Sequence, residues 1–188
     1  MDLPVAVNIS PRVLGHAGFV TTVREALQAS GLPASRLTLE ITESSFPENT
    51  RLLSATLSRL RDLGVRLSVD DFGTGWSTLT KLKELPVQEL KIDRSFVSTM
   101  AEDDRDRSIV RSIVDLAHSL GLCVVAEGVE TEEVADLLHD LGCPLAQGYL
   151  FSRPIPGQEL TGWVLRQQLK TGGRRTSRPT GAEDTRHH

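Results

Sequence analysis

The sequence predicts an α/β fold of alternating parallel strands and helices, an incomplete (β/α)₈ TIM-type barrel with about six βα units. Three observations support this. Six short runs rich in β-branched residues alternate with segments of helical periodicity. A polar side chain lies in or just after most of these runs. The chain has 188 residues, whereas a complete barrel of this type takes roughly 250.

The expected elements follow one another in regular order. Helical spacing of apolar residues at i, i+3, i+4 and i+7 occupies Phe19–Ser30, Asn49–Leu63, Asp103–Leu120 and Thr131–Leu141. Each ends near a glycine, the residue that most readily takes a positive φ. A strand followed by a helix, repeated along the chain, implies a parallel sheet with helices outside it. The strands are expected at Val5–Ser10, Leu37–Thr42, Arg66–Asp71, Leu90–Arg94, Cys123–Gly128 and Leu145–Tyr149.

The polar residues of these strands favour a barrel over an open, doubly wound sheet. In a barrel the C-terminal ends of the strands converge on one mouth, whereas an open sheet spreads them along an edge. Any single one of them is also explained as a helix cap or loop anchor. Burying the whole set without partners would cost several kcal/mol for each charge, so the set together indicates a site. It consists of Asn8, Glu40, Asp70, Asp71, Lys91, Glu127 and Gln147.

Composition and charge restrict the location and the partners. No apolar run approaches the roughly 20 residues of a membrane-spanning helix, and the first residues do not resemble a signal peptide, so we expect a cytoplasmic protein without a membrane span. Residues 170–188 hold five basic and two acidic side chains without hydrophobic periodicity, and we expect a disordered basic tail there, after a domain at residues 1–169. That domain has 16 basic and 23 acidic side chains, which argues against a nucleic-acid partner.

The chemistry of the set points to hard cations. Glutamate, aspartate and asparagine oxygens are the ligands that Mg²⁺ or Mn²⁺ prefers, and the two cysteines lack the spacing of a zinc site. The adjacent Asp70 and Asp71 suit two ions that share a carboxylate. Two such ions assist in-line displacement at phosphorus. Lys91 would add a fixed positive charge, either near the reacting water or as a neutralising partner of the aspartates.

Six strings in the chain closely resemble the EAL-domain family, bacterial phosphodiesterases that linearise the second messenger cyclic di-GMP. The resemblance runs in order from about Val5 to Pro156. The strings are Val7-Asn8-Ile9-Ser10, Glu40-Ile41-Thr42-Glu43-Ser44, Asp70-Asp71-Phe72-Gly73-Thr74-Gly75, Lys91-Ile92-Asp93-Arg94-Ser95-Phe96-Val97, Ala126-Glu127-Gly128-Val129-Glu130-Thr131 and Gln147-Gly148-Tyr149-Leu150-Phe151.

This resemblance implies roles for individual residues. The first metal would be held by Asn8, Glu40 and Asp70. Asp70 would bridge to a second metal held by Asp71 and Glu127, and Lys91 would hold the hydrolytic water. The predicted catalytic residues are therefore Lys91, Glu127 and Asp71, with Mg²⁺ or Mn²⁺ as cofactor.

The resemblance also implies supporting residues around the mouth. Gln147 and Glu130 would bind substrate or support the site, and Glu43 would anchor the loop after Asp71. That loop would act as a switch, and it carries Trp76 where the family usually has tyrosine. Its residues include Phe72, Gly73, Thr74 and Gly75.

The glutamate-alanine-leucine signature that names the family is expected to be missing. In the family it lies on an early strand before the Asn8 segment and supplies a first-metal ligand. Glu25-Ala26-Leu27 has the same letters, but it lies inside the helical pattern Phe19–Ser30 and away from its apolar stripe, so Glu25 is predicted to be a solvated helix residue. We therefore expect a weakened first metal site.

Three functions follow from these observations. The first is cyclic di-GMP hydrolysis to linear pGpG by a domain that is weak or inactive as this isolated chain. The second is a degenerate EAL module that binds cyclic di-GMP or a protein partner without catalysis. The third is another metal-dependent barrel that uses Lys91 as a base, against which the close match of the strings argues. Because the missing units would leave open sheet edges, we expect a homodimer or an upstream polypeptide to cover them.

Overall fold

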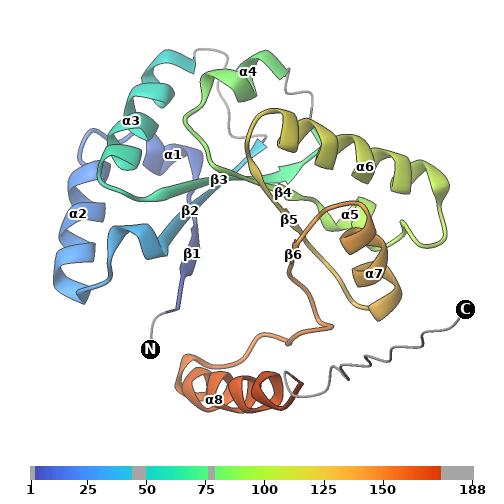
Figure 1. Cartoon of the computed structure of the whole chain (residues 1–188). Coiled ribbons are helices and arrows are strands. Elements are labelled where there is room, and N and C mark those ends of the chain that lie inside the picture. Colours follow the sequence, from blue (N-terminus) through green and yellow to red (C-terminus); the bar gives the residue numbers. More distant parts are fainter. Residues whose placement is uncertain (1–2, 44–49, 76–78, 175–188) are drawn as a thin grey trace, which may run out of the picture. The chain divides into compact units, whose positions relative to one another are not determined.

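The computed structural model describes residues 3–43, 50–75 and 79–174, and the chain divides into two compact units, Met1–Phe151 and Ser152–His188. The first unit is built around one parallel sheet of six strands in the order β1 to β6 (Figure 1). The strands are β1 Val5–Asn8, β2 Leu37–Thr42, β3 Arg66–Phe72, β4 Glu89–Ile92, β5 Cys123–Ala126 and β6 Leu145–Ala146.

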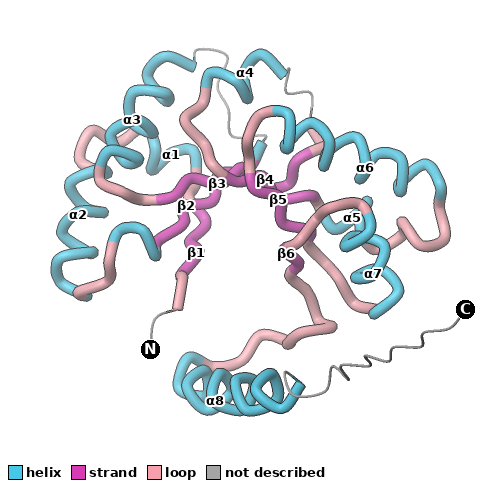
Figure 2. Tube along the Cα trace, in the orientation of Figure 1, coloured by secondary structure: helices cyan, strands magenta, loops and turns pink. Residues whose placement is uncertain are grey.

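Helices follow the strands and lie outside the arc that the strands form (Figure 2). Sequential strand order means that every crossover turns the same way, so all the connecting helices lie on one face. A doubly wound sheet would reverse its order partway. The incomplete-barrel prediction is thus confirmed. The helices of this unit are α1 Pro11–Leu14, α2 Phe19–Ser30, α3 Thr50–Asp62, α4 Leu79–Glu84, α5 Arg94–Val97, α6 Asp104–Ser119 and α7 Glu132–Asp140, with a 3₁₀ turn η1 at Ala34–Arg36.

The two faces of the central strands differ in chemistry. Residues that point toward the helices are apolar and buried, such as Ile41, Val69 and Ile92, each with no exposed surface. Alternate residues point to the concave inner face. There the buried side chains are polar or charged, and they include Thr38, Glu40, Ser68, Asp70 and Lys91. The apolar face forms the core, and the polar face holds the site.

The two outer strands of the sheet are exposed. Every residue of β1 is exposed, with Val5 at 43% and Val7 at 41%. At the other edge Leu145 of β6 is 45% exposed. In the described residues neither strand pairs on its outer side. An unpaired, apolar strand edge offers a row of free backbone groups to another segment.

The expected elements match the structure closely, and the differences lie at their ends. The strand Leu37–Thr42 and the helix Phe19–Ser30 have the bounds that the sequence predicts. Helices α6 and α7 each begin one residue later, because Asp103 and Thr131 serve as caps whose side chains accept backbone N–H groups. β6 ends at Ala146, three residues before its expected end.

In its described part, the second unit contains one helix, α8, at Gly157–Arg174. The expected disordered tail begins at residue 170, but residues 170–174 belong to this helix. The remaining part, 175–188, lies outside the described residues. Among the described helices, none combines the length and the apolar character that crossing a membrane requires.

Candidate metal centre and adjoining pocket

Two aspartates lie opposite one lysine where β3 meets β4. The register pairs Val69 with Leu90 and resumes with Phe72 and Ile92, so Asp70 and Asp71 together face Lys91. This is a β-bulge, in which an extra residue interrupts the alternation of side chains along a strand. Asp71 has a φ of 55°, the single positive value among described residues other than glycine. The bulge allows two consecutive residues to serve the same site.

The Lys91 ammonium lies among three carboxylates, which come from β2, from β3 and from the residue directly after β5. Its Nζ is 3.0 Å from Glu40 Oε2, 3.1 Å from Asp70 Oδ1 and 2.5 Å from Glu127 Oε1. Lys91 is only 3% exposed. Burial opposes its charge, but hydrogen bonds to Glu127 and Glu40 raise the pKa of Lys91 above its ordinary value. The lysine is therefore held as a buried cation.

A second group of carboxylates overlaps with the first. Asp70, Asp71 and Glu127 each place an oxygen so that all three lie within 4.8 Å of one another. Burial, followed by the charges of Asp70 and Asp93, raises the pKa of Asp71. Burial also raises the pKa of Glu127, although Lys91 opposes that rise. The single positive charge of Lys91 thus compensates only part of the negative charge of its four neighbouring carboxylates, Glu40, Asp70, Asp71 and Glu127.

This donor set fits divalent metal ions. Carboxylate oxygens from neighbouring strands are the ligands that Mg²⁺ and Mn²⁺ prefer, and the excess negative charge calls for further cations. Ser68 provides an independent observation, because its fully buried Oγ has no hydrogen-bond partner among the described residues. Ser68 is paired in register with Glu40. It lies two residues before Asp70 and therefore on the same face of β3. An unpartnered buried hydroxyl beside such a cluster is suited to a bound water or ion.

The loop after Asp71 is tied to Glu43. The Glu43 carboxylate is 4% exposed, and its Oε2 accepts the Gly73 N–H at 2.9 Å and the Gly75 N–H at 3.4 Å. Thr74 adds a bond from its hydroxyl to the Asp71 carbonyl at 2.9 Å. Hydrogen bonds therefore connect the loop to Glu43, directly after β2, and to Asp71 in the bulge. Trp76, the aromatic residue expected here, lies outside the described residues.

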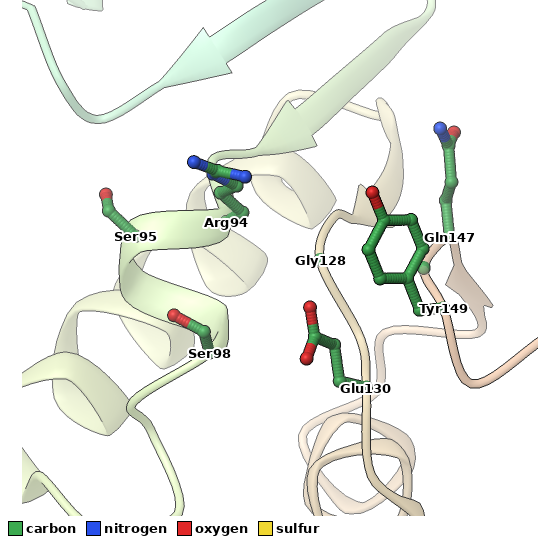
Figure 3. A pocket seen from close by; sticks show the side chains of 8 residues that line it. Arg94, Ser95, Ser98, Gly128, Glu130, Gln147 and Tyr149 are labelled. Atoms are coloured by element: carbon green, nitrogen blue, oxygen red, sulfur yellow. The ribbon is translucent and has the colours of Figure 1, made fainter. Parts of the chain in front are cut away.

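A pocket of about 540 Å³ adjoins the cluster (Figure 3). Glu127 immediately precedes Gly128 of the pocket wall, and Gln147 at the end of β6 bonds through its N–H to the Ala126 carbonyl at 2.8 Å. Figure 3 shows the Tyr149 ring standing across from Arg94, with the Glu130 carboxylate between the two walls. The lining residues are Arg94, Ser95, Ser98, Gly128, Glu130, Gln147, Gly148 and Tyr149.

Two glycines allow the walls of this pocket to approach closely. A Cβ at Gly128, whose φ is 71°, would lie 2.5 Å from the Arg94 Cβ. At Gly148 a Cβ would lie 2.1 Å from the Val129 carbonyl oxygen, a backbone atom that cannot rotate away. Because they lack a Cβ, Gly128 and Gly148 allow the segment after β5 to pack closely against α5 and against the segment after β6.

The structure places the sequence-predicted residues as follows. Glu40, Asp70, Asp71, Lys91 and Glu127 converge in one cluster, and Gln147 and Glu130 line one pocket. Asn8 lies beside Glu40 in register on exposed β1, and the structure gives no contact between its side chain and the described cluster.

Other sequence expectations concern Glu25 and the residues around the pocket. Glu25 is exposed on helix α2, which confirms that it is a solvated helix residue. Sequence reasoning did not assign Ser95, Ser98 or Tyr149 to the pocket. The position of Tyr149 directly after Gln147-Gly148, where a polar strand end meets an aromatic residue, was the sequence signal that could have placed it in the pocket.

Comparison with known proteins agrees with this geometry. The family model for the EAL domain matches residues 1–154. Over 159 residues the chain is 46% identical to the bifunctional diguanylate cyclase/cyclic di-GMP phosphodiesterase MucR of Pseudomonas aeruginosa, a match that covers 85% of this chain and 23% of MucR. The chain thus spans less than a quarter of that relative.

Two solved structures extend the comparison. The EAL domain of DcpA from Mycobacterium smegmatis is 44% identical with a TM-score of 0.83, and the match covers 87% of this chain and 73% of that one. BlrP1 of Klebsiella pneumoniae, solved as a complex with manganese and cyclic di-GMP, is 34% identical with a TM-score of 0.75, covering 81% of this chain and 39% of that one. The family match, the shared fold and the motif residues at the strand ends together show that the chain belongs to the EAL-domain family.

Proposed function

We propose that this chain carries the reaction centre of a cyclic di-GMP phosphodiesterase, which hydrolyses one phosphodiester bond of the cyclic dinucleotide to give linear pGpG with Mg²⁺ or Mn²⁺. The observation that carries the proposal is the cluster of Asp70, Asp71 and Glu127, whose oxygens lie within 4.8 Å of one another. It lies at the C-terminal ends of parallel strands, where barrel enzymes place their active sites.

Each residue of the cluster has a defined task in this reaction. Asp70, Asp71 and Glu127 would hold two cations, Asp70 would contribute to both positions, and Glu40 and Asn8 would complete the first. When bound, the cations polarise the phosphoryl oxygens and favour an attacking water at neutral pH. The water oxygen forms a bond to phosphorus and loses a proton, and the bond from phosphorus to the 3′ oxygen breaks as that oxygen takes up a proton to become a hydroxyl. Lys91 orients the water and balances the negative charge that develops on phosphorus.

The adjoining pocket suits the substrate's nucleoside part. Its volume of about 540 Å³ lies within the ~300–1,000 Å³ range of small-molecule sites. Tyr149 is 52% exposed and offers a face on which a purine ring stacks. Arg94 supplies a cation for a phosphate, and Gln147 and Glu130 supply hydrogen-bonding groups for a base edge.

The open sheet edges lead us to propose that the isolated chain is weak or inactive. Exposed apolar residues on β1 and β6 lie where a complete barrel would continue its sheet. The occupant we propose is a polypeptide that supplies further βα units, because the chain covers only 73% of the DcpA EAL domain. Asn8 lies on the exposed edge strand, so covering that edge would also order the first metal position.

The first experiment measures hydrolysis by the purified 188-residue chain. The protein is incubated with cyclic di-GMP and Mn²⁺ or Mg²⁺, and linear pGpG is quantified by chromatography. We expect little or no product. Rapid metal-dependent formation of pGpG would show that the open edges do not limit activity.

The second experiment completes the barrel. The part of the MucR EAL domain that precedes the matched region is fused before this chain, and we expect metal-dependent hydrolysis to appear. Asp71→Asn in the fusion should lower the rate at least a hundredfold, whereas Glu25→Gln on exposed α2 should leave it unchanged. A folded fusion that binds cyclic di-GMP without hydrolysing it would refute the proposal and support the alternative, a binding module without catalysis.

A further inference from the structure

Lys91 already fills part of the space that a metal ion would need. Its ammonium contacts Glu40, Asp70 and Glu127 at 3.0, 3.1 and 2.5 Å. An ammonium has three N–H donors, and here each meets one carboxylate. The lysine is therefore fully partnered, in an arrangement that resembles the coordination of a cation by three ligands.

The carboxylates of Asp70 and Glu127 are also the ones that a metal requires. Asp70 and Glu127 belong to the carboxylate group that also contains Asp71. A divalent ion that binds this group would meet a positive charge that lies 3.1 Å from Asp70 and 2.5 Å from Glu127, two of its ligands. Lys91 and the ion therefore compete for the negative charge of Asp70 and Glu127.

We infer that Lys91 is an internal counter-ion of the metal site, and that metal binding displaces it from Asp70 and Glu127. The inference rests on the proposed metal site. It adds that breaking the ion pairs of Lys91 reduces the affinity of that site for a metal. In the metal-free protein the lysine stabilises the cluster. In the metal-bound protein the released ammonium is available to the substrate.

The backbone makes this competition a fixed property of the sheet. The bulge places Asp70 and Asp71 together opposite Lys91 on the neighbouring strand. Burial makes the ion pairs costly to break, because a buried charge that loses its partner remains uncompensated. By linkage, an ion pair that stabilises the metal-free state lowers the affinity for the metal to the same degree.

The experiment compares Mn²⁺ affinity in variants of the 188-residue chain, by titration with the electron paramagnetic resonance signal of free Mn²⁺ as the readout. Lys91→Met removes the charge and keeps an unbranched side chain, and we expect it to bind Mn²⁺ at least tenfold more tightly than the unmodified chain. Lys91→Arg keeps the charge and should bind no more tightly than the unmodified chain. Lys83→Met, at an exposed lysine of α4, is the matched control and should change nothing.

A second measurement uses thermal unfolding, with and without Mn²⁺. Without metal, Lys91→Met should melt below the unmodified chain, since its carboxylates lose their counter-ion. Mn²⁺ should raise its melting temperature by more than it raises that of the unmodified chain. If Lys91→Met does not fold, Lys91→Gln takes its place in both measurements.

The outcomes separate this inference from the proposed function. Equal or weaker Mn²⁺ binding by the uncharged variants overturns the inference, and hydrolysis by the completed barrel would leave the proposed function standing. Tighter binding by the uncharged variants supports the inference even if the completed barrel does not hydrolyse cyclic di-GMP. Absence of Mn²⁺ binding in every variant overturns both the inference and the metal-dependent mechanism.

Discussion

The left-handed backbone at Asp71 makes its ligand role and its conformational role separable by mutation. Asp71→Asn and Asp71→Ala both remove the carboxylate from the cluster. Asparagine tolerates a positive φ because its short polar side chain bonds locally, whereas alanine does not. With φ at 55°, alanine therefore carries a conformational cost that asparagine avoids.

The size of this cost follows from the dihedral angle. A left-handed conformation costs an ordinary L-residue roughly 1–2 kcal/mol. In a chain of this length each kcal/mol lowers the melting temperature by about 2–4 °C. We therefore expect metal-free Asp71→Ala to melt about 2–8 °C below Asp71→Asn. Asp71→Asn should melt at or above the unmodified chain, because burial and the charges of Asp70 and Asp93 raise the pKa of Asp71 and so oppose its ionised form.

The assay is differential scanning fluorimetry at neutral pH in EDTA, paired with Mn²⁺ titration. Both variants should lose Mn²⁺ affinity equally, because both lack the carboxylate. Asp115, exposed in helix α6, is the control, since there alanine should melt above asparagine by helix propensity. Equal melting temperatures for Asp71→Ala and Asp71→Asn would show that the bulge imposes no conformational cost.

Three further predictions concern the surroundings of the site. Glu43→Gln replaces the charged acceptor of the Gly73 N–H by a neutral one. Because a hydrogen bond to a charged group contributes about 1.5–3 kcal/mol, hydrogen exchange of the Gly73 amide should accelerate at least tenfold. Gly148→Ala forces a Cβ against the Val129 backbone at 2.1 Å, and denaturant titration should show a loss of about 1–3 kcal/mol or more. Burial raises the pKa of the Cys143 thiol to about 11, so this thiol should resist Ellman's reagent at pH 9 in the folded chain. The free energy of unfolding should also fall as the pH rises from about 9 to 11, because only the thiol of the unfolded chain ionises in that range.

Each of these has a matched control or a contradicting result. Glu102→Gln, at an exposed position, should leave amide exchange in the loop unchanged. Gly18→Ala meets nothing within 4 Å and should be close to neutral. Rapid modification of Cys143 at the rate of the more accessible Cys123 would contradict the burial argument for the thiol.

Sequence alone was sufficient for the order of the six strands and of helices α2, α3, α6 and α7, whereas the short helices α1, α4 and α5 were not predicted. Strands such as Leu37–Thr42 have β-branched residues next to turn signals, and helix Phe19–Ser30 has a continuous apolar stripe, so local pattern and tertiary packing favour the same structure. The end of β6 and the start of the predicted tail differ from the structure. For β6 the reason is physical. Pairing partners decide where a strand stops, and an edge strand has only one neighbour.

The candidate site was partly predictable for the same reason. Parallel strands bring their C-terminal ends to one side, so Glu40, Asp70 and Glu127 could be expected together from the chain order. Their distances to Lys91 could not, because a register shift between β3 and β4 sets them. No local pattern in the sequence predicts that shift, since it depends on the alignment of β3 with β4, which are separated by residues 73–88.

The sequence by itself determined the βα alternation, the carboxylate-rich set and the family to which its motifs belong. The tertiary structure decided which of these residues meet. It placed Lys91 among three carboxylates, left Asn8 on an exposed edge strand and joined Tyr149 to Arg94 across a pocket. The physical reason is that side-chain type and local spacing are written along the chain, whereas contacts between strands depend on register, and one bulge changes which side chains face one another.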